Sequence, residues 1–422
     1  CDVPAAALNP ARRKRRPYQD ETGRDQKLSC APGAKRCASP LPVAFADRGR
    51  SVSPWSGFGA SLMFSSRLQR CTVGGCSALR RGLARAGAWI RARPRLAAWL
   101  YPKEATTPEE RYRAFNGWYF SNLHEQERML ADRVRMDFYH AAITRHIRPG
   151  DRVVDLGTGT GILAAFASRQ GAAKVFAIDH SAILRQARKL AAANGIERVA
   201  FLAMHSTQFT VEEPVDAIVH EQMGDALFDE AMVANVCDLR DRVLKPGGLV
   251  LPSRFELYCE PVTLKDERRV PFLWELNVHG FDYASMERHR PQDPGYYRLT
   301  SSDRGVVDHF LGEPEPVVTI DLQTLREAEL PLTLSFTRRV TQAGRLDGYA
   351  VYFCAKVDAD LRLSTSPLDA NRAPHWGFRI LRTERIDFAV GDRIEVQLRV
   401  GRWPDLDSWR WSQVKRTAGE TP

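Results

Sequence analysis

The chain is poor in the residues that build metal sites and disulfide frameworks. Only three cysteines lie beyond residue 100, and they are scattered: Cys237, Cys259 and Cys354. No CxxC pair or Cys/His cluster has the spacing of a zinc site, so no metal is expected. Isolated thiols are typical of a reducing compartment, and we expect a cytoplasmic protein. No apolar run approaches the roughly 18–20 residues of a transmembrane helix, so no membrane partner is expected.

Acidic residues are scarce in one part of the chain only. Residues 1–100 hold 19 Lys and Arg against 5 Asp and Glu, whereas the remainder holds 42 against 46. The overall net charge of +10 therefore comes from the beginning of the chain. The mildly acidic remainder argues against a nucleic-acid partner for the folded domains. A length of 422 residues predicts two domains with extensions rather than a single core.

Residues 1–104 form a basic leader that we expect to be disordered. No acidic residue lies in 48–103. The run RRKRR (12–16) is typical of a nuclear address or an anion-binding arm. The Arg-rich segment 78–100 is similar to a transit peptide or a membrane-surface helix. A disordered extension, translated sequence upstream of a start near Met63, a targeting segment and a binding arm therefore all stay open.

Helical and strand patterns alternate from residue 105 onward. Apolar residues three and four apart predict helices over 105–150. The expected strands that follow are 152–156, 174–178, 199–203, 215–219 and 249–252, and the expected helices are 162–170, 181–193 and 230–244. This alternation predicts an α/β fold with a doubly wound, Rossmann-like parallel sheet over 105–253. Its ligand should lie at the carboxyl ends of the strands.

The first strand runs into a glycine turn that lacks two phosphate-binding features. Ile162 stands where the dinucleotide fingerprint GxGxxG has its third glycine, and no P-loop lysine follows. The glycines that are present are Gly157, Gly159 and Gly161. Glycines allow the backbone to approach a ligand closely. The turn predicts S-adenosylmethionine, with another nucleotide or a purely structural turn as the alternatives.

Two carboxylates are placed to contact that ligand. Asp155 immediately precedes the glycine turn, where its charge suits a cationic amino group better than a phosphate. Asp179 ends the next strand, a position from which it can accept hydrogen bonds from ribose hydroxyls. We therefore expect both residues, together with the three glycines, to bind the methyl donor.

Two further carboxylates flank a loop after the fourth strand. In HEQMGDALFDE (220–230), Glu221 and Glu230 lie at the two ends of the loop, between strand 215–219 and a helix. Paired glutamates on a loop are most often solvated surface charges. Their place after a sheet strand, beside the expected methyl donor, favours an acidic pocket that holds a positively charged acceptor.

Four features together resemble the protein arginine methyltransferases. They are the GTGTG turn, Asp179, the two glutamates nine residues apart, and PHWGF (374–378). Further similar segments follow the family's order over roughly 115–410: WYF (118–120), ERMLADRVR (127–135), LKPGGLVLPSR (244–254), VHGFDYASM (278–286) and STSP (364–367). The resemblance implies an enzyme that transfers a methyl group from S-adenosylmethionine to a guanidino nitrogen of arginine in protein substrates.

The resemblance also implies roles for individual residues. Glu221 and Glu230 would clamp the substrate guanidinium through charge-assisted hydrogen bonds. Arg135 would contact the donor's carboxylate and orient Glu221. His375 and Asp132 would form a dyad that accepts or relays the proton. The remaining lining residues would be Met232 beside the donor, and Tyr119, Met129 and Trp376 at the acceptor site.

The chemistry of arginine agrees with such a clamp. A guanidinium, whose pKa lies above about 12, is a poor nucleophile until its charge is localised away from the attacking nitrogen. Two carboxylates that bind the guanidinium nitrogens other than the attacking one (its far nitrogens) draw the positive charge toward themselves. They also hold the attacking nitrogen in line with the methyl group. Positioning of this kind can lower the barrier by several kcal/mol.

From 254 to 415 the pattern changes to the alternation that is typical of strands. The expected strands are FELYCEPV (255–262), EPVVTIDL (315–322), LPLTLSFTR (330–338), GYAVYFCAKV (348–357), GFRILRTE (377–384) and RIEVQLRV (393–400). They resemble the family's all-β barrel substrate domain. The interruption at about 280–312 matches the position of the family's dimerisation arm, which implies a homodimer.

The chain departs from the family at several positions. Gln222 replaces the usual tryptophan of the acidic loop, and Asp225 replaces a tyrosine or small residue. Thr207 falls where an acidic residue often meets the adenine, and no second tyrosine follows the YF pair. Two alternatives therefore stay open: a methyltransferase for a small guanidino or amine compound, and a catalytically silent dimeric homologue. The retained glutamates and His375 weigh against the silent homologue.

Overall fold

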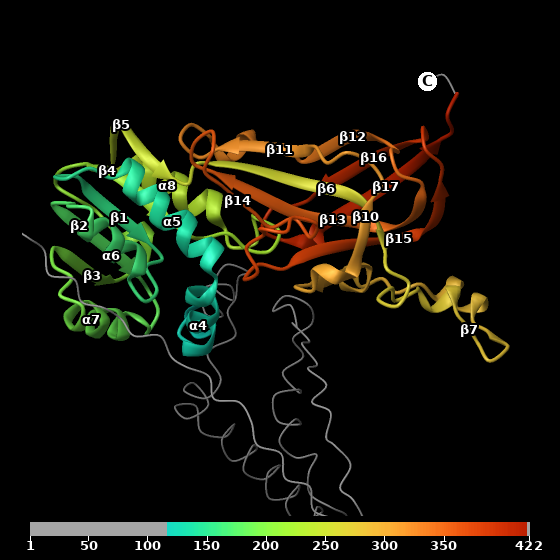
Figure 1. Cartoon of the computed structure of the whole chain (residues 1–422), viewed down its shortest axis with the longest axis horizontal. Coiled ribbons are helices and arrows are strands. Elements are labelled where there is room, and N and C mark those ends of the chain that lie inside the picture. The colour runs from blue at the N-terminus through green and yellow to red at the C-terminus, as the bar shows by residue number, and fades with distance from the viewer. Residues whose placement is uncertain (1–115, 420–422) are drawn as a thin grey trace, which may run out of the picture. The chain divides into compact units, whose positions relative to one another are not determined.

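A five-stranded parallel sheet forms the first half of the described chain (Figure 1). The computed structural model describes residues 116–419, so the expected leader 1–104 lies outside the described residues. The strands are β1 (Arg152–Leu156), β2 (Lys174–Asp179), β3 (Val199–Ala203), β4 (Val215–His220) and β5 (Leu244–Leu251). They lie in the order β3-β2-β1-β4-β5, and every neighbouring pair is parallel. The predicted doubly wound, Rossmann-like sheet is confirmed.

Crossover segments connect these strands, as a parallel sheet requires. They contain α6 (Ile162–Arg169), α7 (Leu184–Ala193), the 3-10 helix η1 (Ser206–Gln208) and α8 (Met232–Val243). Two further helices, α4 (Leu123–Ala131) and α5 (Arg133–His146), precede β1. The central strands are apolar on both faces: Val153 and Val154 of β1 and Ile218 of β4 have no exposed surface. Burial of both faces explains why these strands read as continuous apolar runs instead of alternating ones.

Two element boundaries differ from the expected pattern, for local reasons. The helical pattern of 105–150 is interrupted at Asp132, which has extended backbone angles and whose carboxylate accepts a hydrogen bond from the Arg135 N–H. An aspartate in this position caps a new helix, so one periodic stretch becomes two helices. At the other end of the sheet, α8 runs directly into β5 at Leu244, five residues before the expected strand.

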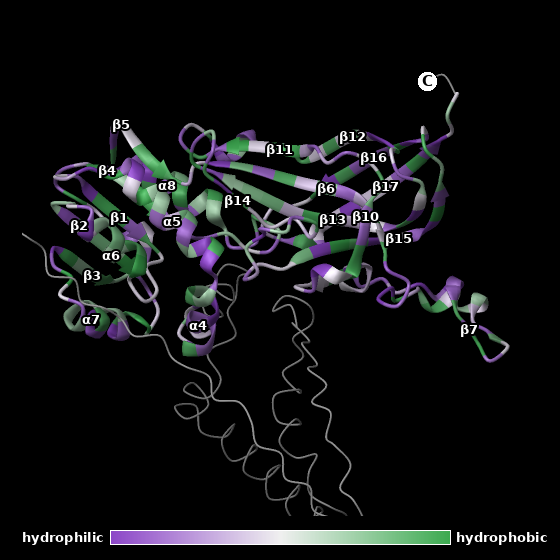
Figure 2. Ribbon diagram, viewed as in Figure 1, coloured by the Kyte–Doolittle hydropathy of each residue, from purple (hydrophilic) through white to green (hydrophobic). Residues whose placement is uncertain are grey.

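The second half of the described chain is built from antiparallel sheets. The seven-stranded sheet contains β6 (Arg254–Leu264), β9 (Arg298–Ser301), β10 (Val307–Phe310), β11 (Pro316–Asp321), β13 (Gly344–Lys356), β14 (Arg362–Ser364) and β15 (Phe378–Phe388). The three-stranded sheet contains β12 (Thr333–Arg339), β16 (Arg393–Val400) and β17 (Trp409–Arg416). Every predicted strand of this half is present. The alternation that predicted them is visible as stripes of hydrophobic and hydrophilic colour along β6 (Figure 2).

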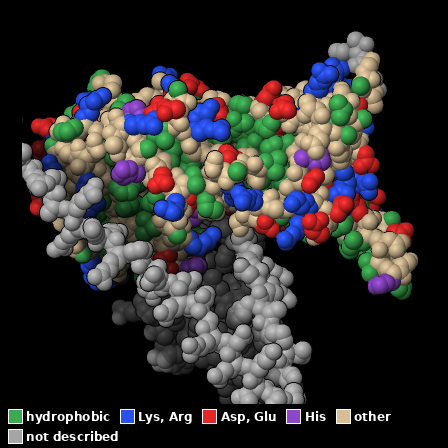
Figure 3. Space-filling view, in the orientation of Figure 1, with side chains coloured by type: hydrophobic (Ala, Val, Ile, Leu, Met, Phe, Trp, Pro, Cys, Tyr) green, Lys and Arg blue, Asp and Glu red, His purple; other side chains and the backbone are tan. Residues whose placement is uncertain are grey.

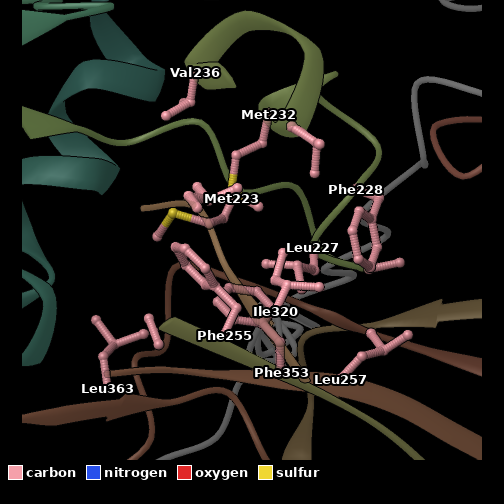
Figure 4. Packing of buried hydrophobic residues seen from close by; sticks show 14 of the residues in the cluster. Met223, Leu227, Phe228, Met232, Val236, Phe255, Leu257, Ile320, Phe353 and Leu363 are labelled. Carbon is pink, nitrogen blue, oxygen red and sulfur yellow. The ribbon is translucent and has the colours of Figure 1, made fainter. Parts of the chain in front are cut away.

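One hydrophobic core is shared by the parallel and antiparallel halves. Figure 4 shows Met223, Phe228 and Met232, from the acidic loop and the start of α8, packed over Phe255 and Phe353 of strands β6 and β13. All five side chains are buried. The acidic loop therefore rests on the antiparallel sheet through its apolar residues, which leaves its carboxylates free to face elsewhere.

The interruption between β6 and β9 forms a small projecting unit (Figure 1). It holds a two-stranded hairpin, β7 (Asn277–Val278) and β8 (Phe281–Asp282), between the short 3-10 helices η2 (Leu273–Glu275) and η3 (Ala284–His289). Phe281 at the hairpin is 74% exposed, and Val278, Tyr283 and Met286 are exposed as well. These apolar side chains therefore lie outside the buried core.

Charges of both signs are interspersed over the face of the molecule that Figure 3 shows. Such a face lacks the single-sign potential that nucleic-acid recognition uses. Within 116–419, no helix is long and apolar enough to cross a membrane. The same residues contain no group of three or more His, Cys, Asp or Glu arranged for a metal ion. The three cysteines of this part are buried and free.

Candidate active site

An open pocket lies at the carboxyl ends of β1, β2 and β4. This is the edge at which the sheet order predicts a ligand. The lining residues are Asn116, Phe120, Gln126, Met129, Leu130, Arg135, Gly157, Thr158, Gly159, Thr160, Ile162, Leu163, Asp179, His180, Ser181, Glu221, Gln222 and Glu230. The predicted donor turn and both predicted glutamates therefore line the same cavity.

The glycine turn needs glycine for conformation and for space. Gly157, Gly159 and Gly161 all have positive φ, which other residues rarely adopt. A Cβ on Gly159 would lie 3.1 Å from Oε1 of Gln126, and one on Gly161 would lie 3.0 Å from the Phe201 ring. The turn can therefore keep its backbone at the pocket wall only with these residues.

Asp179 lines the pocket and also shapes it. Its Oδ2 accepts a hydrogen bond from the Gly159 N–H at 2.9 Å, and its Oδ1 accepts one from the Ser181 N–H at 2.7 Å. One carboxylate thus joins the glycine turn after β1 to the segment after β2. The remaining lone pairs of this carboxylate are at the pocket, where the prediction places ribose hydroxyls.

Asp155 is buried beneath the glycine turn. It is 1% exposed and is not a lining residue. Its Oδ2 accepts hydrogen bonds from Thr158 Oγ1 at 2.5 Å and from the Ala164 N–H at 2.9 Å. Burial raises the pKa of Asp155 to about 7. Through these two hydrogen bonds the carboxylate holds the glycine turn to the start of α6.

The two glutamates stand in different electrostatic surroundings. Glu221 forms an ion pair with Arg135, with 2.7 Å between its Oε2 and Nη2 of the arginine. Glu230 forms no ion pair with any cation of residues 116–419. Burial, followed by the negative charge of Glu221, raises the pKa of Glu230 well above its usual range. The pocket therefore holds one compensated carboxylate and one that an added cation would stabilise.

Arg135 organises the side of the pocket opposite the glycine turn. Its Nη1 donates to the Met129 carbonyl at 2.8 Å, and its Nη2 lies 4.0 Å from the Met129 sulfur. The guanidinium also lies 5.8 Å from the centre of the Trp376 ring. The Arg135 side chain is buried, so these contacts fix the position of its guanidinium. The ion pair with the guanidinium then fixes the position of the Glu221 carboxylate. The predicted orienting role of Arg135 matches this geometry.

His375 and Asp132 meet through the backbone instead of the imidazole. Asp132 Oδ2 accepts a hydrogen bond from the His375 backbone N–H at 3.0 Å, while Nδ1 of the ring is buried without a partner. Burial, and then the charge of Arg135, lowers the pKa of His375 to about 3. A dyad of ring and carboxylate is therefore not formed, because Asp132 already caps α5 with its other oxygen. The ring is neutral near pH 7.

Three other predicted residues are not among those that line this pocket. Trp376 is buried, and its Nε1 donates to the Met223 carbonyl at 2.6 Å, which ties the PHW segment to the acidic loop. Met232 has no exposed surface and belongs to the shared core (Figure 4). Tyr119 does not line the pocket, and Phe120 does. Residue type alone could not distinguish lining from packing at these positions.

Several lining residues carry no signal in the sequence. Gln126 places its Nε2 on the Phe120 carbonyl at 2.9 Å, and Ser181 and Gln222 each have a buried side-chain oxygen without a partner. Only the position of Gln222 within the acidic loop and of Ser181 after Asp179 could have indicated them. Their unpartnered oxygens mark where a ligand's polar groups can bind.

Comparisons with known proteins agree with this arrangement. The protein family described as "Methyltransferase domain" matches residues 153–248. A probable protein arginine N-methyltransferase 6 of Arabidopsis thaliana is 35% identical over 243 residues, which are 57% of this chain and 55% of the relative. Protein arginine N-methyltransferase PRMT10 of Oryza sativa subsp. japonica is 31% identical over 316 residues, 67% of this chain and 82% of the relative. The crystal structure of Arabidopsis thaliana protein arginine methyltransferase 10 is similar at a TM-score of 0.62 and 26% identity, and the match covers 72% of this chain and 97% of that one.

The match to a methyltransferase domain, together with the parallel sheet, the glycine turn and the cavity at the carboxyl edge, identifies a class I methyltransferase, whose methyl donor is S-adenosylmethionine. The relatives narrow this class further. The chain belongs to the protein arginine N-methyltransferase family. The resemblance carried by the acidic loop and the PHW segment is thereby confirmed.

The pocket's own atoms fit this donor. The glycine turn offers backbone without Cβ atoms, and Asp179 offers a carboxylate at the wall. Unpartnered polar atoms lie on Ser181, Gln222 and Arg135, all of which line the cavity. Hydrogen-bond capacity and close backbone approach are both present, as a nucleoside with hydroxyl and carboxylate groups requires.

The Gly159→Ala substitution tests the donor turn. The positive φ and the 3.1 Å approach to Gln126 predict about tenfold weaker binding of S-adenosylhomocysteine in isothermal calorimetry. Gly150→Ala is the matched control, because Gly150 also has positive φ but has no atom within 4 Å of a Cβ and is not a lining residue. We expect that control to lose stability and to keep its affinity. Equal affinities of the two variants would contradict the assignment of the turn.

Proposed function

We propose that this protein transfers a methyl group from S-adenosylmethionine to a guanidino nitrogen of arginine residues in proteins. The observation that carries the proposal is the position of Glu221 and Glu230, which line one pocket together with the donor turn. Arg135 compensates one of the two carboxylates. The pocket thus retains one negative charge for a cationic acceptor.

In the proposed mechanism the two glutamates bind the acceptor guanidinium through its far nitrogens. Glu221, held by Arg135, is rigid and sets the plane of the guanidinium. Glu230 adds the second contact and draws positive charge away from the attacking nitrogen. When bound, the donor supplies an electrophilic methyl group on a sulfonium. The new nitrogen–carbon bond forms as the sulfur–carbon bond breaks, and the methylated guanidinium group then releases one proton.

Glu230 is the group best suited to receive that proton. Its raised pKa makes it a stronger base than an ordinary carboxylate. His375 is a weaker candidate, because its ring is neutral but of strongly lowered pKa and contacts Asp132 only through the backbone. We therefore place the proton on Glu230 first, with His375 positioning the PHW segment against α5.

The proposal extends to domains and partners. We assign 105–253 to donor binding and 254–415 to the substrate domain, with an arm at about 280–312 whose exposed apolar tip supports a homodimer. The acceptor is an arginine-containing protein segment rather than a free small molecule, in keeping with the names of the relatives. A cytoplasmic location is supported by the three buried free thiols.

The Glu230→Gln substitution tests the clamp. The amide keeps the size of the side chain but removes the charge that holds the guanidinium, so we expect kcat to fall about a hundredfold or more. Binding of S-adenosylhomocysteine should remain unchanged. Glu212→Gln, at an exposed position outside the pocket, is the control for charge alone. Normal turnover in the Glu230 variant would refute the assigned role.

The acidic limb of the pH profile follows from the same residue. Only ionised Glu230 can hold the cation, so kcat/KM for the acceptor should rise with pH through the raised pKa of Glu230, well above the ordinary value of 4.5. At pH values above the pKa of Glu230 both glutamates are charged. At pH values below it only Glu221 can pair with the acceptor. A profile measured from pH 5 to 9 on an arginine peptide should show the rise. A limb that is unchanged in Glu230→Gln would contradict the assignment.

A further inference from the structure

The acidic loop contains two more carboxylates than the clamp uses. Asp225 and Asp229 lie between Glu221 and Glu230, and Asp229 is buried. Their negative charges raise the pKa of Glu230, after the effects of burial and of Glu221. Four carboxylates in one short loop repel each other, so the loop keeps its shape only if cations of the protein lie beside it.

One buried arginine of the antiparallel sheet supplies that charge. Arg379 of β15 is 3% exposed, and its Nη2 lies 3.2 Å from Oδ2 of Asp225 and 3.4 Å from Oδ2 of Asp229. Its Nη1 donates to Thr300 of β9. The guanidinium therefore joins the acidic loop to two strands of the neighbouring sheet.

The same segment of chain holds the loop at two further points. The Gly377 N–H donates to Asp225 Oδ1 at 2.8 Å, and Trp376 Nε1 donates to the Met223 carbonyl. Within the loop, Asp229 Oδ1 accepts from the Ala226 N–H, and a Cβ on Gly224 would come within 2.0 Å of that oxygen. The loop is thus closed tightly around a carboxylate whose counter-charge is Arg379.

We propose that Arg379 is a positioning residue for the acceptor site, which pins Asp225 and Asp229 so that Glu221 and Glu230 hold the spacing a guanidinium requires. The inference rests on the proposed function for its kinetic consequence only, because the ion pairs themselves do not depend on the acceptor. Arg379 touches neither the donor pocket nor its lining residues Glu221 and Glu230.

Arg379→Gln should weaken acceptor use without affecting donor binding. A small shift of the glutamates is sufficient to lower kcat/KM for an arginine peptide about 10- to 100-fold. The affinity for S-adenosylhomocysteine should stay within about twofold, because the glycine turn is not touched. Amide hydrogen exchange over 222–230 should accelerate in the variant. The expected change in hydrogen exchange does not depend on which acceptor the enzyme uses.

Arg338→Gln is the matched control. Arg338 is an equally buried arginine of the same half of the chain, paired with the buried Glu260 through two hydrogen bonds of 2.8 Å. Its loss leaves a buried carboxylate unpaired, as the loss of Arg379 does, and should lower the unfolding temperature to a similar degree. It should not change kcat/KM or exchange in the loop. Equal kinetic losses in the two variants would overturn the proposal.

Rescue and partial variants complete the test. In Arg379→Gln/Asp229→Asn the buried carboxylate is no longer unpaired, so part of the lost kcat/KM should return.

If Arg379→Gln does not fold, Asp225→Asn provides the test, because it removes one partner of Arg379 and leaves Asp229 paired. It should lower kcat/KM less and move the acidic limb to lower pH, since Asp225 raises the pKa of Glu230. Additive losses in the double variant, or wild-type kinetics in Asp225→Asn, would contradict the positioning role of Arg379.

The two levels of inference fail separately. If wild-type protein methylates no arginine peptide, the proposed function is wrong. Faster hydrogen exchange of the acidic loop in Arg379→Gln would then still show that Arg379 holds the loop in place. If arginine peptides are methylated and neither exchange nor kcat/KM responds to Arg379→Gln, the positioning role is wrong and the function stands.

Discussion

Negative charge confined in a poorly solvated loop is the constraint on which the rest of the structure depends. Glu221, Asp225, Asp229 and Glu230 lie within ten residues, and two of them have pKa values raised by burial. Arginines from two different parts of the chain, Arg135 of α5 and Arg379 of β15, compensate part of this charge. What remains uncompensated is the driving force for binding a cation.

This constraint explains why the parallel and antiparallel halves share one core. The acidic loop needs a rigid support for its apolar side and a cation for its polar side, and the antiparallel sheet provides both. Phe255 and Phe353 pack under the loop, while Trp376 and Arg379 bond to it. All the lining residues of the pocket belong to the parallel half, and the antiparallel half supports the acidic loop from outside the pocket.

Local patterns in the sequence were sufficient for the sheet and for the position of the pocket. The glycine turn, Asp179 and the two glutamates could be recognised because each follows a strand whose carboxyl end must lie at the same sheet edge. Contacts between residues far apart in the sequence could not be recognised in this way. Nothing near Arg379 indicates that its guanidinium meets residues 150 positions earlier, and nothing in PHW indicates that His375 would meet Asp132 through its backbone. The sequence also could not show that Met232 packs in the core, or that Asp155 forms hydrogen bonds with Thr158 and Ala164.

The central claim is that the pocket selects a guanidinium presented by a peptide. Its most direct test is mass spectrometry of the products formed with isotope-labelled S-adenosylmethionine on three acceptors: an arginine peptide, the same peptide with lysine in place of arginine, and a free guanidino compound. The structure predicts label on the arginine side chain of the first acceptor and on neither of the others. Label on the free compound alone, or on the lysine peptide as readily as on the arginine peptide, would contradict the account.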